Sequence, residues 1–270
     1  MRWHCHELYH RIPQGGVAGG IAVVIDVLRA STTIITALAH GAAGVRPVLT
    51  IEQARELAAG SGAGPAMLLG GERGGLRIDG FDLGNSPLEY APARVAGRRI
   101  VITTTNGTAA LDACGAAAEV LIGAIVNRTA VAARARELAR SQGVAHIHLV
   151  CAGTDGQVTE EDLLAAGGIL DAASRLAGSD RDTLDASAMA ARAEFRDVLA
   201  AAGGADAALA ITAAFATSRG GRNLVDLGMQ ADLPAAAAVD SLPVVPRLDR
   251  GRGPKDGEAG WLLPDAADPA

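Results

Sequence analysis

Aromatic residues are scarce in this chain, since Phe, Trp and Tyr make up only 3% of its 270 residues. Its core must therefore be built from Ala, Val, Leu and Ile, which favours closely packed helices and β-branched strands. Cysteine is also rare: Cys5, Cys114 and Cys151 are odd in number and widely spaced. This spacing argues against a disulfide framework.

Long apolar runs are missing as well. No uninterrupted apolar stretch reaches membrane-spanning length, and no N-terminal segment joins a basic start to a long apolar run. We therefore expect a cytoplasmic protein with no membrane partner. The formal net charge of −6 argues against nucleic acid as a partner, so an anionic ligand would need a local basic pocket.

The composition is that of a globular protein, with 49% hydrophobic and 20% charged residues. We expect residues 1–246 to form a single α/β catalytic unit. Residues 247–270 are rich in Pro, Gly and charge, and we expect them to form a flexible tail in which only Trp261 and its two leucine neighbours are apolar. The sequence leaves formation of a homo-oligomer open.

Strand and helix signals alternate along the first half of the chain. Short β-branched or apolar runs predict strands at 20–26, 45–49, 66–69, 99–103, 120–125 and 146–151. Helical patterns lie between them, and Thr50-x-x-Gln53 is a capping box that predicts the start of one helix. This alternation predicts an α/β fold with a mostly parallel sheet flanked by helices. Residues 185–217 should be mainly helical, and short strands at 235–239 and 242–245 should close the fold.

The order of these elements repeats. Residues 20–75 and 99–156 each read as β-loop-α-β-α-β, and the pentapeptide Ala-Arg-Glu-Leu-Ala occurs at 54–58 and again at 135–139. The pattern favours an internal duplication of this β-loop-α-β-α-β unit.

Residues capable of chemistry follow four of the predicted strands, in loops at 26–33, 70–82, 103–108 and 153–162. Ligands in open α/β sheets bind at the carboxyl ends of strands. The four loops together therefore predict one ligand site.

The loop that begins at Gly70 packs glycines, arginines and carboxylates into a short segment. Glycines let peptide N–H groups approach an anion, arginines grip phosphate or sulfonate, and carboxylates hold a hard cation such as Mg²⁺. We interpret Arg73 as an anion contact and Glu72 as a metal ligand or acid–base group. Asp82 offers a further metal ligand, with Asp79 and Asn85 nearby, although a turn would also use these side chains structurally.

Two aspartates at strand ends are further candidates for catalysis and metal binding. Asp26 would hold Mg²⁺ or orient water, and its alternative role is to cap a helix or a turn. Asp155, within Gly-Thr-Asp-Gly, has the same two readings. By contrast, the acids at 160–162 stand in a first helical turn, where they complement the helix dipole, and we interpret them as structural.

Candidate phosphate-binding residues surround two predicted helix starts, where hydroxyl and backbone N–H groups form an anion cradle. They are Arg29, Ser31 and Thr32 in the first loop and Thr104, Thr105, Asn106, Gly107 and Thr108 in the third. A compact polyanion would suit this set.

With these motifs, the chain resembles the 2-phosphosulfolactate phosphatase (ComB-like) family. The resemblance rests on Val23–Thr33, Gly71–Gly75, Phe81–Pro87, Thr103–Thr108, Cys151–Gly156 and Asp240–Pro246, in this order. It implies an α/β phosphatase that uses Mg²⁺ to cleave 2-phospho-3-sulfolactate to 3-sulfolactate and phosphate, a step of the kind used towards coenzyme M.

The residues leave several alternatives open. A carboxylate could activate the attacking water, or it could attack phosphorus directly and form an acyl phosphate. The substrate could be another small phosphorylated acid, or the chain could be a non-catalytic anion-binding protein on the same fold. The several carboxylates beside the anion site favour a metal enzyme over simple anion binding.

Overall fold

The computed structural model describes residues 1–60, 67–176, 182–204, 206–251 and 260–265. These residues form one mixed, mostly parallel sheet flanked by helices, so the predicted α/β class is confirmed. Within them the sheet has eleven strands, in the order β5-β4-β6-β3-β11-β10-β7-β2-β8-β1-β9.

The strands are short and mostly buried. Their bounds are β1 Arg2–His6, β2 Ile21–Ile25, β3 Gly44–Pro47, β4 Leu68–Arg73, β5 Leu76–Arg77, β6 Arg99–Thr103, β7 Glu119–Ile122, β8 His146–Cys151, β9 Thr183–Leu184, β10 Pro246–Asp249 and β11 Trp261–Pro264. Strands β2, β3, β4, β6, β7 and β8 correspond to the six strands predicted from the sequence, with shifts of a few residues at their ends.

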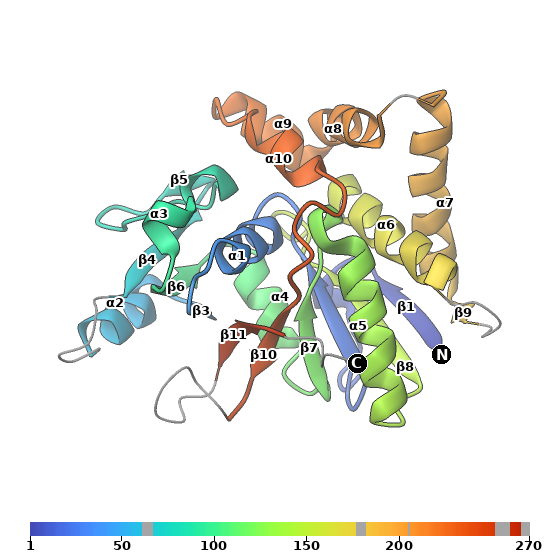
Figure 1. Ribbon diagram of the computed structural model, residues 1–270, viewed down its shortest axis with the longest axis horizontal. Helices are drawn as coiled ribbons and strands as arrows, with labels where there is room; N and C mark the ends of the chain where they lie inside the picture. The colour runs from blue at the N-terminus through green and yellow to red at the C-terminus, as the bar shows by residue number, and fades with distance from the viewer. Residues whose placement is uncertain (61–66, 177–181, 205, 252–259, 266–270) are drawn as a thin grey trace.

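Helices cover the sheet and one end of it. Their bounds are α1 Ala30–Ala39, α2 Ile51–Ala59, α3 Pro92–Val95, α4 Gly107–Ala113, α5 Arg128–Ser141, α6 Glu160–Leu176, α7 Ala186–Ala201, α8 Ala207–Thr217, α9 Arg219–Asp226 and α10 Asp232–Ala237, with 3-10 turns η1 Tyr9–Arg11, η2 Pro87–Glu89 and η3 Ile125–Asn127. Helices α5 and α6 lie over β2 and β8, and α8, α9 and α10 gather at the top of the view in Figure 1. The predicted capping box of Thr50 and Gln53 is confirmed at the start of α2.

The sheet contains two groups of parallel strands, β4-β6-β3 and β7-β2-β8-β1-β9. In one group β6 lies between β4 and β3, and in the other β2 lies between β8 and β7. The first strand of each half of the chain is thus inserted between the second and third strands of the other half. This arrangement makes the two halves structurally interdependent, and their origin by duplication stays a prediction.

An antiparallel hairpin of β10 and β11 joins the two groups. Strand β10 pairs with β7 through Arg247 and Leu121, and β11 pairs with β3 through Leu262 and Val45. The flexible tail expected from residue 247 is therefore wrong for these strands, whereas residues 252–259 and 266–270 lie outside the described residues.

Trp261 explains why this segment is ordered in spite of its composition. Its side chain is fully buried, in a small cluster with Phe81 and Val101. The guanidinium carbons of Arg46 and Arg99 lie 5.9 and 5.6 Å from its ring centre, within cation–π range. The tail thus completes the core between the two groups of parallel strands.

Two further expectations near the C-terminal end of the fold differ from the structure. Residues 235–239 were expected to form a strand, but Asp232–Ala237 is helix α10, and no strand forms at 242–245. The apolar runs in both segments are buried against the core instead of pairing with a strand.

Strand β1 was not expected, and it creates a cluster of four histidines. His4 and His6 on β1 lie beside His146 and His148 on β8, with neighbouring rings 4.9 to 6.4 Å apart between centres. One hydrogen bond joins each pair of rings. His4 Nε2 lies 3.0 Å from His146 Nδ1, and His6 Nε2 lies 3.1 Å from His148 Nδ1. Asp185, at the start of α7, places its Oδ2 3.2 Å from His4 Nδ1.

This cluster should make the protein less stable in acid. Burial, with the neighbouring histidines, lowers the pKa of His148 to about 4. A folded-state pKa below the unfolded value of about 6.5 means that the unfolded chain takes up the proton first, so stability is lost as the pH falls from about 6.5 towards 4.

The measurement is the melting temperature at pH 7.5 and pH 5.0 for the wild type, His148→Gln and the exposed-site control His10→Gln. Asp26 and Asp162 have raised pKa values and oppose the trend in the same pH range, so the comparison between variants isolates His148. We expect His148→Gln to lose less stability on acidification than the other two proteins. An equal loss in all three would show that His148 has no part in it.

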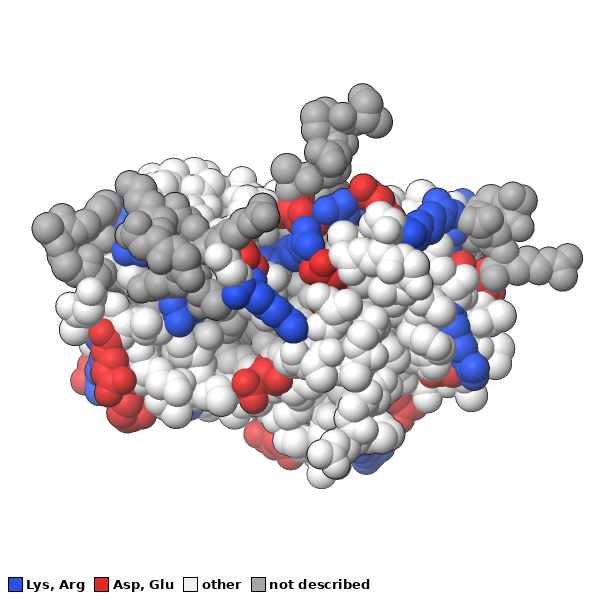
Figure 2. All heavy atoms as spheres, turned by 90° about the horizontal axis from the view of Figure 1, so that it is seen from below, with Lys and Arg blue, Asp and Glu red and all other residues white. Residues whose placement is uncertain are grey.

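Charges of both signs are mixed on the outer surface, in keeping with the modest net charge of −6. On the face shown in Figure 2, basic and acidic side chains lie next to one another among uncharged residues. None of the helices in the described ranges is long and apolar enough to span a membrane.

Candidate active site

A pocket of about 350 Å³ opens where four loops meet. The loops follow β2, β4, β6 and β8, and helix α9 forms another wall. The polar residues of its lining include Asp26, Arg29, Glu72, Asn85, Thr105 and Asp155. The four loops singled out in the sequence therefore border one cavity.

Asp26 stands directly after β2 and is 9% exposed. Its backbone N–H donates to Ser31 Oγ at 2.9 Å, and its Oδ1 accepts from the Ala30 N–H at 3.2 Å. Its other oxygen approaches helix α4, where a Cβ added to Gly107 would stand 2.7 Å from Asp26 Oδ2. Glycine is thus required at 107 for the Asp26 carboxyl group to occupy this position.

The Asp26 carboxyl group titrates near neutral pH. Burial is the main cause that raises its pKa to about 7, and the negative charges of Glu72 and Glu161 add to the effect. A pKa close to 7 is suited to a group that exchanges protons in catalysis, and a bound cation would favour the ionised form.

Glu72, near the end of β4, connects two of the loops. Its Oε2 accepts from the Gly75 N–H at 2.8 Å and from Thr105 Oγ1 at 3.2 Å, and its Oε1 accepts from the Thr105 N–H at 2.8 Å. The tight turn at Gly74 and Gly75, both with positive φ, brings the donor of Gly75 back onto the carboxylate. The Glu72 carboxyl group is therefore fixed in place as a hydrogen-bond acceptor.

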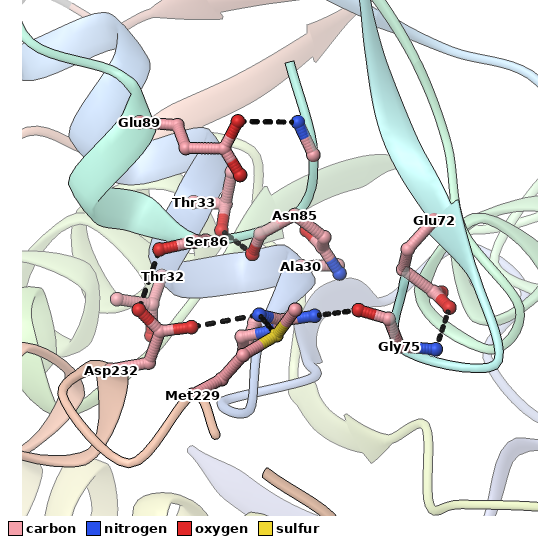
Figure 3. A network of polar contacts seen from close by, with 12 residues as sticks. Ala30, Thr32, Thr33, Glu72, Gly75, Asn85, Ser86, Glu89, Met229 and Asp232 are labelled. Carbon is pink, nitrogen blue, oxygen red and sulfur yellow. Dashed lines mark hydrogen bonds and ion pairs between the residues drawn. The ribbon is translucent and has the colours of Figure 1, made fainter. Parts of the chain in front are cut away.

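Arg29 joins the pocket wall to the C-terminal helices, and its partners Gly75 and Asp232 are labelled in Figure 3. Its Nη1 forms an ion pair with Asp232 at 2.8 Å, and its Nη2 donates to the Gly75 carbonyl at 2.7 Å. Asp232 also accepts from Ser86 at 2.6 Å. Since both ion-pair partners are only 3% exposed, Arg29 positions three segments of the wall as well as contributing positive charge to the pocket.

Asp155 lies at the rim of the pocket. Its side chain is 61% exposed and forms an ion pair with Arg219 at 3.0 Å. Its backbone has a φ of 52°, the left-handed region that Asp tolerates better than most residues. Its position leaves it more accessible to solvent than Asp26 or Glu72.

Other predicted site residues do not line the pocket. Ser31, Thr32, Thr104 and Thr108 are buried, and their hydroxyl groups bond to neighbouring backbone or side-chain groups. They brace the loops, whereas Thr105 and Asn106 reach the pocket itself.

Arg73 and Asp82 point to other parts of the structure. Arg73 donates to the Glu72 carbonyl, the Leu49 carbonyl and Thr103 Oγ1, at 2.7, 3.3 and 2.9 Å. Asp82 is exposed and accepts from the Leu69 N–H at 2.8 Å. Neither side chain belongs to the pocket lining, so the geometry gives no support to the anion-binding role of the one or the metal-binding role of the other.

A buried carboxylate next to the pocket, Asp162, is not predicted by the sequence pattern. Asp162 accepts from the Val27 N–H at 2.8 Å and from the Gly153 N–H at 2.9 Å, which ties the loops after β2 and β8 together. Burial and the charges of Asp26 and Glu161 raise its pKa well above the usual value. Its place in a first helical turn pointed only to a dipole effect, and no local pattern signals a partner 135 residues away.

Helix α9 was also missed as a wall of the pocket. Gly220, at its start, approaches Glu161 so closely that an added Cβ would stand 2.3 Å from Oε1. The segment Ser218–Arg222 combines two glycines with two arginines, which is the signal that could have drawn attention to it.

The charge of the pocket bears on whether it could hold a metal ion. Its lining carries four carboxylates, Asp26, Glu72, Asp155 and Asp226, and a single arginine, Arg29. In the described part of the chain, no three His, Cys, Asp or Glu side chains are grouped as a closed metal site. The donors instead fit Mg²⁺, which often binds one or two carboxylates and takes its other ligands from water and substrate phosphate.

Comparison with known proteins identifies the family of this chain. A family model for 2-phosphosulpholactate phosphatase matches residues 7–251. A probable 2-phosphosulfolactate phosphatase of Symbiobacterium thermophilum is 43% identical over 242 residues, which cover 89% of this chain and 96% of that protein. One of Deinococcus radiodurans is 42% identical over 235 residues, covering 86% of this chain and 88% of that protein. The chain belongs to the 2-phosphosulfolactate phosphatase family.

Proposed function

We propose that this protein uses Mg²⁺ to hydrolyse 2-phospho-3-sulfolactate to 3-sulfolactate and phosphate. The observation that carries the proposal is the charge of the pocket, whose lining holds four carboxyl side chains and one arginine, Arg29, which is already paired with Asp232. A substrate with phosphate, sulfonate and carboxylate groups would be repelled by these walls unless a cation lay between them. The names of the relatives supply the substrate, and the pocket supplies the reason for the metal.

Asp26 and Glu72 are the residues that would hold Mg²⁺. The ion would neutralise negative charge on the phosphoryl oxygens during the reaction. Asp26 Oδ2 has no hydrogen-bond partner among the described residues, and Asp26 gains a stable ionised form when a cation is close. Glu72 is already fixed by three donors, so it would contribute charge without moving.

The chain's own groups would carry out the remaining steps. An attacking water oxygen bonds to phosphorus while its proton passes to a carboxylate of the pocket, Asp26 or, where Asp26 holds the ion, Asp155 at the rim. The bond between phosphorus and the substrate C2 oxygen breaks, and this oxygen becomes the hydroxyl of 3-sulfolactate by taking a proton from solvent. The Asn106 backbone N–H before α4 and the Arg29 guanidinium border the pocket, where they can contact phosphoryl or carboxylate oxygens.

The test is phosphate release by the wild-type protein from three compounds: 2-phosphosulfolactate, 2-phospholactate and an aryl phosphate. We expect kcat/KM to be highest for 2-phosphosulfolactate. Turnover of the other two compounds alone would keep the phosphatase and reject this substrate, and no turnover of any compound would favour an anion-binding protein.

A further inference from the structure

The wall of the pocket contains a buried oxygen atom that has no partner. Asn85 lines the pocket and is 5% exposed, and its side-chain Oδ1 has no hydrogen-bond partner. Among the buried side-chain atoms without a partner in the described ranges, Oδ1 of Asn85 is the one that belongs to a residue of this lining. An acceptor that is buried without a donor destabilises the fold, so it indicates that the pocket binds something able to complete its bonding.

The loop that carries Asn85 is held in place from two sides. The Asn85 carbonyl accepts from Thr33 Oγ1 at 2.7 Å, and Ser86 Oγ donates to Asp232 at 2.6 Å. In Figure 3 the Asn85 side chain extends toward the side of Glu72, and no dashed line reaches its amide. The fold therefore keeps this acceptor in the pocket wall without giving it a donor.

The missing partner must offer positive charge or a hydrogen-bond donor. The two terminal nitrogens of Arg29 are engaged with Asp232 and with the Gly75 carbonyl. A fully ionised 2-phosphosulfolactate carries only acceptor oxygens, so the substrate cannot satisfy Oδ1 either. A hard cation can, because such ions take oxygen ligands that include the side-chain carbonyl of asparagine.

An amide oxygen suits the charge of this pocket. Asp26 and Glu72 line the same cavity, and two carboxylates leave most positions around a divalent cation to be filled by other oxygens. Asparagine supplies such an oxygen without a charge. A further carboxylate would strengthen the repulsion of a polyanionic substrate by a lining that already holds four carboxyl side chains.

We infer that Asn85 Oδ1 is a neutral oxygen ligand of the Mg²⁺ that Asp26 and Glu72 would hold. This inference rests on the proposed function, from which it takes the identity of the ion. It adds to the two carboxylates a residue that binds the ion and neither takes up nor releases a proton.

The experiment measures the affinity of the substrate-free protein for Mg²⁺, from the rise of the melting temperature with MgCl₂ concentration. The wild type is compared with Asn85→Ala and Asn85→Asp. Loss of the oxygen in Asn85→Ala should raise the apparent Kd of Mg²⁺ by at least about tenfold. Asn85→Asp places a carboxylate oxygen at the same point, so its affinity for Mg²⁺ should equal or exceed that of the wild type.

Asn223→Ala is the matched control. Asn223 lines the same pocket from helix α9, but it is exposed, and its replacement should leave the affinity for Mg²⁺ unchanged. Without Mg²⁺, Asn85→Ala should melt within a few degrees of the wild type, because its Oδ1 makes no hydrogen bond that could be lost. Asn85→Asp should melt lower without Mg²⁺ and gain more from it.

Kinetics at saturating Mg²⁺ give a second readout. Asn85→Ala should keep the KM for 2-phosphosulfolactate within about threefold of the wild type, because its defect lies in binding the ion. Asn85→Asp should raise this KM, because it adds negative charge next to a polyanion.

The outcomes separate this inference from the proposed function. An unchanged Kd of Mg²⁺ in Asn85→Ala would overturn the inference, and so would a loss of affinity in Asn85→Asp as large as that in Asn85→Ala. A wild type that Mg²⁺ stabilises but that releases no phosphate would contradict the proposed function and support binding of the ion. Phosphate release without Mg²⁺, by a protein whose melting temperature does not respond to MgCl₂, would overturn the inference and keep the phosphatase.

Discussion

Asp26→Asn should fold like the wild type and lose roughly a hundred- to ten-thousandfold in kcat, the range in which a positioned acid–base group contributes. The substitution keeps the shape of the side chain and its acceptor for the Ala30 N–H, so the loop after β2 should stay in place. It removes the negative charge that faces the pocket and the group whose pKa lies near 7. Both proposed roles of the residue, metal ligand and proton acceptor, are lost together.

The measurement is steady-state phosphate release with saturating Mg²⁺, together with the melting temperature. A matched control is Asp197→Asn, an exposed aspartate on helix α7, which should retain wild-type kinetics. If Asp26→Asn kept a kcat within a few-fold of the wild type, Asp26 would have no part in the chemistry, and the pocket would need another base.

Trp261→Ala should give the largest loss of stability among single substitutions in the C-terminal segment. The indole is fully buried, and replacing a buried tryptophan by alanine costs about 3–5 kcal/mol in the free energy of unfolding. For a protein somewhat larger than 150–250 residues, this corresponds to a fall of about 10 °C in melting temperature. The reason is the position of β11, which closes the sheet between β3 and β10.

The control for this prediction is Leu209→Ala on helix α8, where the leucine is 66% exposed. It should shift the melting temperature by no more than a degree or two. A similarly small shift in Trp261→Ala would mean that the segment does not pack on the fold in solution, as the flexible-tail expectation had it.

Two parts of the sheet, strands β6 and β8 and the hairpin that contains Trp261, show what local sequence patterns can and cannot predict. Strands β6 and β8 were placed correctly because continuous apolar, β-branched runs mark strands that are buried on both faces. The role of Trp261 depends instead on a gap between two groups of parallel strands, which exists only after the chain has folded. Composition alone therefore assigned an ordered hairpin to a tail.

The candidate site could be predicted in part for the same reason. Asp26 and Glu72 stand at strand ends, and the rule that ligands bind there is a property of the fold class, so their loops do meet at one pocket. Which way a side chain points is not encoded locally: Arg73 turns toward Leu49, whereas Arg29 reaches the pocket wall. Asp162 could not be recognised because Val27, one of its two hydrogen-bond partners, is 135 residues away in sequence.

The most direct test of the account is phosphate release from 2-phosphosulfolactate by the wild-type protein, first with Mg²⁺ and then with excess EDTA. The acidic pocket predicts rapid release with Mg²⁺, loss of nearly all activity with EDTA and recovery when Mg²⁺ is restored in excess. Equal rates in Mg²⁺ and EDTA would contradict the account, because four carboxylates and one arginine would then have to bind a polyanion unaided.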